Sequence, residues 1–180
     1  MPTDTLKIGS TAPGFTNLPA ADGKKYSLKD FADTKGFAIV FSCNHCPYVQ
    51  AYEDRMIAFQ REYAPKGIRL IAINSNETDN HPEDSFEEMV KRAQQRGFNF
   101  PYLRDEDQFI ARAFGATHTP EFFLFDGQRN LRYQGKMDDN HKDPSAVKVS
   151  YLRDAADAIL ANKDVKLPET YSIGCTIKWK

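Results

Sequence analysis

The chain has 180 residues with 41% hydrophobic and 27% charged side chains, a balance typical of globular proteins that argues against wholesale disorder. Its 24 basic and 25 acidic side chains give a formal net charge of −1. A charge this close to zero supplies no basic surface, so we expect neither nucleic acid nor a membrane as a partner. The length fits one domain, and we predict that residues 1–180 form a single domain.

The N-terminal residues Met1 to Lys7 contain no apolar stretch of the kind that a signal peptide requires. The longest apolar runs, such as Phe37 to Phe41, are far too short to span a bilayer. We therefore predict a cytoplasmic protein.

Hydrophobic spacing and the positions of glycine and proline predict a series of short elements. Apolar side chains from Val49 to Tyr63 recur at intervals of three and four, which is typical of an amphipathic helix, and Gly67 ends it. The predicted elements are, in chain order, a short helix at 27–31, a strand at 37–41, a helix at 49–63, a strand at 68–73, a helix at 86–93, an extended segment at 99–103, a helix at 105–114, a hairpin of strands 121–126 and 131–135, and a helix at 152–160, whereas 1–12 and 168–180 show no regular pattern.

This order of elements predicts the fold class. Strands joined by crossover helices run parallel, and the hairpin near the end adds an antiparallel edge. Sheets of this kind bury both faces under helices. We therefore predict an α/β fold with a mixed central sheet and helices on both faces.

The spacing of Cys43 and Cys46 is the most informative feature of the sequence. This C-x-x-C pair lies where a buried strand meets an amphipathic helix, and the positive end of a helix stabilises a thiolate. We expect both sulfurs on the first helical turn, with Cys43 at its exposed start as the attacking nucleophile. Cys46 would lie one turn in, shielded, and would resolve the mixed disulfide. The dithiol would itself be the redox group, and no separate cofactor is expected.

Neighbouring residues leave alternatives open. A protonated His45 would stabilise the Cys43 thiolate, or its ring could simply face water. Cys43, His45 and Cys46 could instead serve a non-enzymatic metal-binding module, but a zinc site normally needs a second pair of ligands, and no metal is expected. Cys175 could be a third redox thiol, and we favour a buried structural residue, since free cysteine is among the most buried types.

Two polar clusters follow predicted strands, Asn74 to Glu77 and Asp138 to Lys142. The carboxyl ends of parallel strands line sites in open α/β sheets, so either cluster could border the active site. We favour a solvated loop for each.

These residues resemble the thioredoxin-like superfamily, and within it the peroxiredoxin-like branch related to alkyl hydroperoxide reductase and thiol-specific antioxidant. The resemblance rests on the A-P-x-F segment in Thr11 to Phe15, on Cys43 to Cys46, on Thr119-Pro120 before a strand, and on the tail Ile173 to Trp179. It implies a thioredoxin-like fold with a cis bond before Pro120. It also implies that Thr119 and Pro120 form the platform on which a substrate chain pairs.

The resemblance implies a thiol–disulfide oxidoreductase that acts on a protein or small molecule carrying a thiol or disulfide. A thiol-dependent peroxidase is the alternative. Peroxiredoxins carry P-x-x-x-T-x-x-C, and here Ile39 and Cys43 occupy the proline and threonine positions, while their later arginine falls near Pro120. Because these substitutions remove groups that polarise a peroxide, the peroxidase is the less favoured reading. Thioredoxins proper have Trp-Cys-Gly-Pro-Cys, from which Ser42, Asn44 and His45 also depart.

Overall fold

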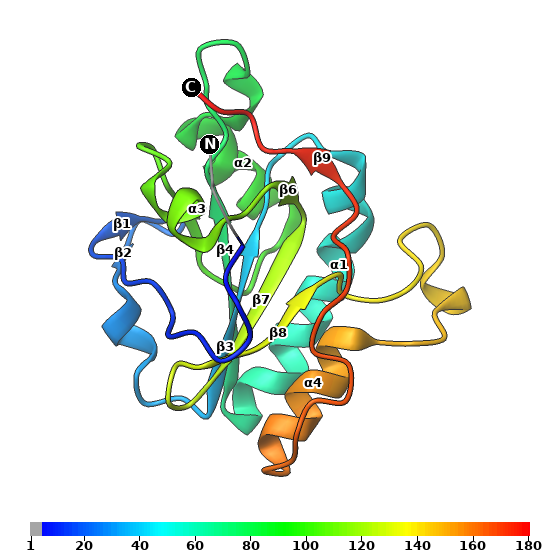
Figure 1. The fold of residues 1–180 in the computed structure, drawn as a ribbon. Helices are drawn as coiled ribbons and strands as arrows, with labels where there is room; N and C mark the ends of the chain where they lie inside the picture. Colours follow the sequence, from blue (N-terminus) through cyan, green and yellow to red (C-terminus); the bar gives the residue numbers. More distant parts are fainter. Residues whose placement is uncertain (1–4) are drawn as a thin grey trace.

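The computed structural model describes residues 5–180 (Figure 1). Residues 1–4, which belong to the segment predicted as irregular and to the N-terminus used against a signal peptide, lie outside the described part. The helices, 3₁₀ helices (η) and strands are β1 (Leu18–Pro19), β2 (Lys25–Tyr26), η1 (Leu28–Phe31), β3 (Gly36–Phe41), α1 (Pro47–Tyr63), η2 (Ala64–Lys66), β4 (Ile68–Asn74), η3 (Pro82–Asp84), α2 (Phe86–Arg96), β5 (Tyr102–Arg104), α3 (Phe109–Phe114), β6 (His118–Thr119), β7 (Glu121–Asp126), β8 (Leu131–Gly135), η4 (Pro144–Ala146), α4 (Tyr151–Leu160) and β9 (Cys175–Thr176).

The central sheet has the strand order β5-β4-β3-β7-β8. β3, β4 and β5 run parallel because α1 and α2 carry the chain back between them. β7 pairs antiparallel with β3, and β8 pairs antiparallel with β7 as the second strand of the predicted hairpin. The prediction of a mixed α/β sheet is therefore confirmed.

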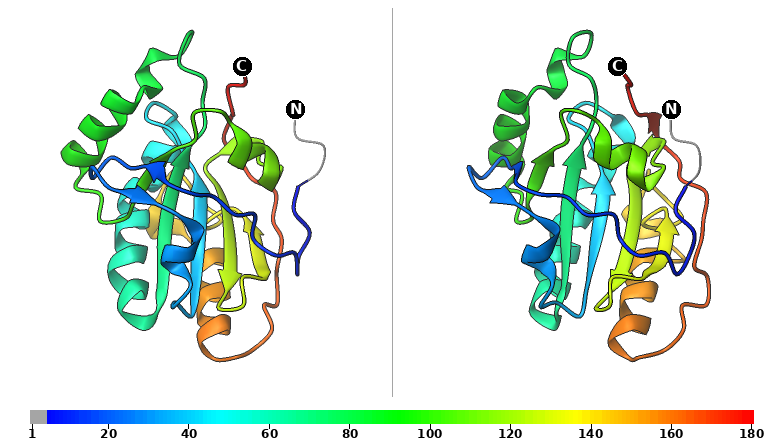
Figure 2. Two further views of the ribbon diagram at one scale, coloured as in Figure 1. Left: turned by 90° about the vertical axis from the view of Figure 1, so that its left-hand side faces the viewer. Right: turned by 60° about the vertical axis from the view of Figure 1, so that its left-hand side comes forward.

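Both faces of this sheet are buried, which explains why its strands read as continuous apolar runs. In β3, Ala38 and Val40 point to the face covered by α1 and α4. Phe37 and Phe41 point to the opposite face, where α3, η1 and the N-terminal segment pack. Figure 2 shows the sheet between these two layers. Among the described residues, no helix combines the length and apolarity needed to cross a bilayer.

The third helix is shorter than predicted. It begins at Phe109 rather than at Asp105. The Asp105 carboxylate accepts hydrogen bonds from the backbone N–H groups of Ile110 and Ala111, so it lies ahead of the helix and caps it from outside. Short acidic side chains compete with the helical backbone in this way and favour such positions over a helix interior.

The C-terminal segment 168–180, which has no sequence period, is nevertheless ordered against the rest of the chain. Its strand β9 pairs antiparallel with β6, with Cys175 opposite Thr119 and Thr176 opposite His118. In Figure 1 the red segment runs from below α4 up to β9, beside β6 and the start of α1. The tail thus reaches the end of the sheet where the two motif cysteines lie.

Candidate active site

The C-x-x-C motif occupies the loop between β3 and α1. Helix α1 begins at Pro47, and Cys46 is its N-cap with extended backbone angles. Proline favours the first helical position, since its missing N–H is not needed there. Cys43 therefore precedes the helix, and the expectation that both sulfurs share its first turn is wrong.

Both motif cysteines are buried. Cys43 is 2% exposed and Cys46 is 0% exposed, and Val49, Tyr48 and Cys175 pack against them. The prediction of an exposed Cys43 is therefore wrong. The sequence pattern places a thiol at a strand-to-helix junction, but it does not reveal that a distant segment of the same chain covers that junction.

The two thiols pack against each other, and their pKa values lie far apart. The hydrogen bond with Cys46, burial and the nearby Asp84 carboxylate raise the pKa of the Cys43 thiol well above its ordinary value. The hydrogen bond from Cys43, then the Cys175 thiol and the backbone N–H of Val49, lower the pKa of Cys46 to about 4 against the cost of burial. The lowered pKa favours a thiolate on Cys46 rather than on Cys43, at the positive end of α1.

The Thr119-Pro120 peptide bond is cis, as the resemblance implied. Thr119 faces both motif cysteines: its Oγ1 lies 3.5 Å from the Sγ of Cys43, and its carbonyl oxygen lies 3.5 Å from the Sγ of Cys46. The structure thus brings Cys43, Cys46, Thr119 and Pro120 together in one site, although more than 70 residues separate the cysteines from the proline.

The backbone of Thr119 already has a partner. It pairs with Cys175 on β9, and the Sγ of Cys175 lies 2.7 Å from the Sγ of Cys46. Cys175 is half-buried rather than buried, so our preferred reading of it as a buried structural residue is wrong. The predicted substrate platform is covered by the chain's own tail.

A buried carboxylate, which the sequence analysis missed, organises the motif loop. Asp84 is 0% exposed, and its oxygens accept hydrogen bonds from the backbone N–H of Asn44 and from the side-chain amides of Asn74 and Asn76. The Oδ1 of Asn44 accepts a further bond from the hydroxyl of Tyr102. In the sequence, Asp84 stands among other acids in a polar stretch, so no local signal distinguishes it from a solvent-exposed residue.

His45 pairs with acidic side chains. Its Nδ1 lies 3.0 Å from an Asp84 oxygen and its Nε2 lies 3.5 Å from a Glu83 oxygen, and its side chain is 35% exposed. The His45 ring also stacks on His81. His45 thus lies beside Cys43, and the Asp84 carboxylate lies close to both residues.

The metal-binding alternative named Cys43, His45 and Cys46. In the described part of the chain, the ligand atoms that lie within 4.8 Å of one another form the sets Cys43–His45–Asp84 and His45–His81–Glu83. Cys46 belongs to neither set, because its sulfur faces Cys175 and the start of α1. The proposed ligand set is therefore wrong in its third member.

The first polar cluster is not a solvated loop, whereas the second is at least partly exposed except at Asp138. Asn74, Ser75, Asn76 and Glu77 are all buried, and their side chains hold Asp84, Asp105 and the tail. In the second cluster Asp138 is buried and binds the hydroxyl of Tyr52 and the guanidinium of Arg55. Both segments border the site. The first carries the amide groups that donate hydrogen bonds to Asp84, and the second lines a hollow together with Pro120.

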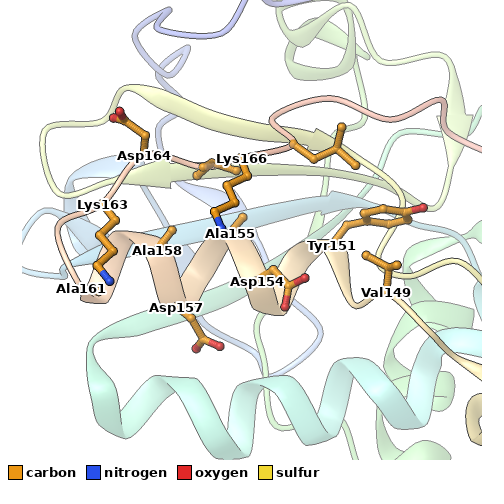
Figure 3. A pocket seen from close by; sticks show the side chains of 12 residues that line it. Val149, Tyr151, Asp154, Ala155, Asp157, Ala158, Ala161, Lys163, Asp164 and Lys166 are labelled. Atoms are coloured by element: carbon orange, nitrogen blue, oxygen red, sulfur yellow. The ribbon is translucent and has the colours of Figure 1, made fainter.

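A separate pocket lies along α4 and the segment that follows it (Figure 3). Its lining side chains come from residues 149–167 and include neither cysteine nor histidine. It therefore offers no thiol for redox chemistry, and the cysteine site remains the candidate active site.

Comparison with known proteins agrees with this geometry. Residues 8–134 match the AhpC/TSA family. The chain belongs to this family. A curated relative, thiol-disulfide oxidoreductase ResA of Bacillus thuringiensis subsp. konkukian (strain 97-27), is 30% identical over 123 residues, which cover 68% of this chain and 66% of that protein. The match thus spans just under two thirds of the relative's length.

Solved structures extend the likeness to the whole AhpC/TSA chain. The crystal structure of a hypothetical protein from Sinorhizobium meliloti 1021 has a TM-score of 0.91 and 38% sequence identity, covering 98% of this chain and 97% of that one. A thioredoxin-family thiol:disulfide interchange protein from Chlorobium tepidum TLS has a TM-score of 0.66 at 20% identity, covering 87% and 99% of the two chains, and shows the fold alone. The prediction of a thioredoxin-like, peroxiredoxin-related chain is confirmed.

Proposed function

We propose that this AhpC/TSA-family chain is a thiol–disulfide oxidoreductase whose redox group is the Cys43–Cys46 dithiol. The observation that carries the proposal is the packed pair of Cys43 and Cys46 at the start of α1, directly beside Thr119 and the cis Pro120, with the pKa of Cys46 lowered. A thiolate is the nucleophile of disulfide exchange, and a helix N-terminus favours it. The name of the ResA relatives supports the same reaction class.

Cys43 is proposed as the sulfur that first bonds to substrate, because it contacts the Thr119 side chain on the platform. As Cys43 attacks one sulfur of a substrate disulfide, its proton passes by way of Cys46 to the second substrate sulfur, which leaves as a thiol, so that Cys46 is again a thiolate. Cys46 then attacks Cys43, which releases the first substrate sulfur and leaves a Cys43–Cys46 disulfide. Two electrons have passed from the dithiol to the substrate.

The proposed substrates are proteins or small molecules that carry a thiol or a disulfide. An extended chain bound at Thr119 would pair by its backbone, in the manner of strand addition. The antiparallel pairing of β9 with β6 supports this mode, since a peptide strand of this chain already fits there.

A trapping experiment tests the proposal. A Cys46→Ser, Cys175→Ser double variant leaves Cys43 as its one thiol, and a peptide with a single disulfide should remain covalently attached to it. The matched control, Cys43→Ser with Cys175→Ser, leaves only Cys46 and should hold little peptide. An adduct confined to the control would reverse the two roles, and the absence of adduct from both would overturn the proposed function.

A further inference from the structure

The C-terminal strand occupies the position at which a substrate chain would pair. β9 lies antiparallel to β6, and Cys175 stands opposite Thr119, the residue before the cis proline. The backbone N–H of Ile177 extends the pairing by donating to the carbonyl of Thr117. The tail therefore presents a cysteine to the site as a bound cysteine-containing peptide would.

The approach of the tail to Thr119 depends on a glycine. A Cβ placed on Gly174 would lie 2.0 Å from the Thr119 carbonyl oxygen, a distance that real side chains do not show. Only the absence of a side chain at 174 lets the two backbones come this close.

Contacts beyond the strand fix the tail in place. The N–H of Lys178 donates to Asn76, its carbonyl accepts from Glu77 and Gln108, and Gln108 also accepts from the N–H of Lys180. Ile177 is buried in the core cluster that holds α3. Backbone bonds at residues 177, 178 and 180 thus hold the chain that directly follows Cys175.

The three sulfurs form a row with Cys46 in the middle. Cys46 packs against Cys43 on one side, and its Sγ lies 2.7 Å from that of Cys175 on the other, compared with about 2.05 Å in a disulfide. Cys175 is the half-buried member of the row, whereas the other two are buried. A disulfide between Cys46 and Cys175 therefore needs only a small movement.

We propose that Cys175 is a third redox-active thiol, which exchanges with the Cys43–Cys46 disulfide to form a Cys46–Cys175 disulfide. The thiolate of Cys175 attacks the Sγ of Cys46, the Cys46–Cys175 bond forms and the Cys43–Cys46 bond breaks. The electron pair leaves on Cys43, which takes up the proton that Cys175 gave up. The exchange involves no net oxidation, so it needs no further oxidant once the first disulfide exists.

This inference rests on the proposed function, which supplies the first disulfide. Its consequence is that Cys43 reacts with the substrate, whereas Cys175 carries the disulfide that is later reduced. Exchange returns Cys43 to the thiol form and moves the oxidised bond to the half-buried Cys175, where a reducing thiol can reach a sulfur without entering the substrate position at Cys43.

Thiol counting in a Cys43→Ser variant tests the proposal. The reduced, full-length variant is treated with diamide, quenched in acid, unfolded and alkylated, and its remaining thiols are counted by mass. We expect the loss of two thiols per chain in a monomer, because Cys46 and Cys175 join. The control Cys46→Ser removes the central sulfur and should keep both of its thiols. Retention of both thiols in Cys43→Ser, or their loss through disulfide-linked dimers, would overturn the proposal.

Peptide mapping of the oxidised wild type provides the second measurement. Trypsin leaves Cys43 and Cys46 on one peptide, 36–55, and Cys175 on another, 167–178, so a Cys46–Cys175 bond joins two peptides. We expect the joined peptides in wild type and their absence in Cys175→Ser, which should still form the Cys43–Cys46 bond. If Cys175→Ser forms no disulfide, the proposed function fails. If it does while Cys43→Ser keeps both thiols, only the role of Cys175 fails.

Discussion

The Nδ1 atom of His45 lies 3.0 Å from an oxygen of Asp84, a carboxylate that is completely buried beneath the motif loop. The same carboxylate is one of the causes that raise the pKa of Cys43. His45 and Asp84 therefore have opposite effects on the Cys43 thiolate: the carboxylate disfavours it, and a protonated imidazole favours it. The balance between the two sets the stability of the reduced protein.

A His45→Ala variant should be more reducing than the wild type. Loss of the imidazole leaves the Asp84 charge less compensated, which disfavours the thiolate and so the reduced protein. A loss of ~1.4 kcal/mol would move this two-electron couple by about 30 mV. Equilibration against glutathione measures the shift. His81→Ala is the matched control, since His81 contacts Glu77 and Glu83 and leaves Asp84 paired. Equal potentials for wild type and His45→Ala would make His45 a bystander.

An Asp84→Asn variant should shift the couple in the opposite direction. Removal of the buried negative charge lowers the pKa of Cys43 and stabilises the reduced form, so the protein becomes more oxidising. It also costs stability, because the new amide meets the Asn76 amide donor at hydrogen-bond distance, and a buried unpaired donor costs about 1–3 kcal/mol. Alkylation rate against pH and urea unfolding measure the two effects. The control Glu83→Gln changes a partly exposed acid and should alter neither the pKa of Cys43 nor the stability. An unchanged pH profile of Cys43 alkylation in Asp84→Asn would contradict the expectation.

The sheet, most of its helices and the closeness of Cys43 and Cys46 in space follow from the sequence because periodicity and short spacing are local signals. Burial of the motif does not follow, since it depends on Cys175, which lies 129 positions from Cys46 and in a segment without a period. The role of Asp84 cannot be predicted for the same reason, because the groups that donate hydrogen bonds to it come from two other loops. The cytoplasmic location stays a prediction.

Hydrogen peroxide should oxidise this protein slowly compared with dithiol–disulfide exchange. Ile39 and Pro120 carry no polar side chain where peroxiredoxins hold and polarise the peroxide, and the Cys43 thiol replaces their threonine. Positioned donors of this kind contribute ~10²–10³ in rate. Stopped-flow oxidation of the reduced protein, beside its reaction with a peptide disulfide, provides the comparison. A peroxide reaction faster than the disulfide reaction would favour the thiol peroxidase instead.

The reduced protein should hold a thiolate on Cys46 down to about pH 4, where ultraviolet thiolate absorbance should disappear. Because the pKa of Cys46 is lowered from 9.0 to about 4, its thiolate stabilises the fold fully above pH 9, and this stabilisation is lost as the pH falls through about 4. The unfolding free energy of wild type should therefore rise relative to that of Cys46→Ser from pH 4 to 9. Cys175→Ala removes one thiol donor and should raise the midpoint, and a midpoint near 9 in wild type would contradict the assignment.

A Gly174→Ala variant should release the tail from the site. The added methyl group would overlap the Thr119 carbonyl oxygen, so β9 must separate from β6 at that point. Cys175 then moves away from Cys46, and the buried dithiol becomes accessible. We expect faster alkylation of Cys43 and Cys46 and faster reaction with a peptide disulfide, with the fold retained by circular dichroism. Gly14→Ala is the matched control, because a Cβ there meets nothing within 4 Å. Equal alkylation rates for the two variants would show that the tail does not limit access to the dithiol.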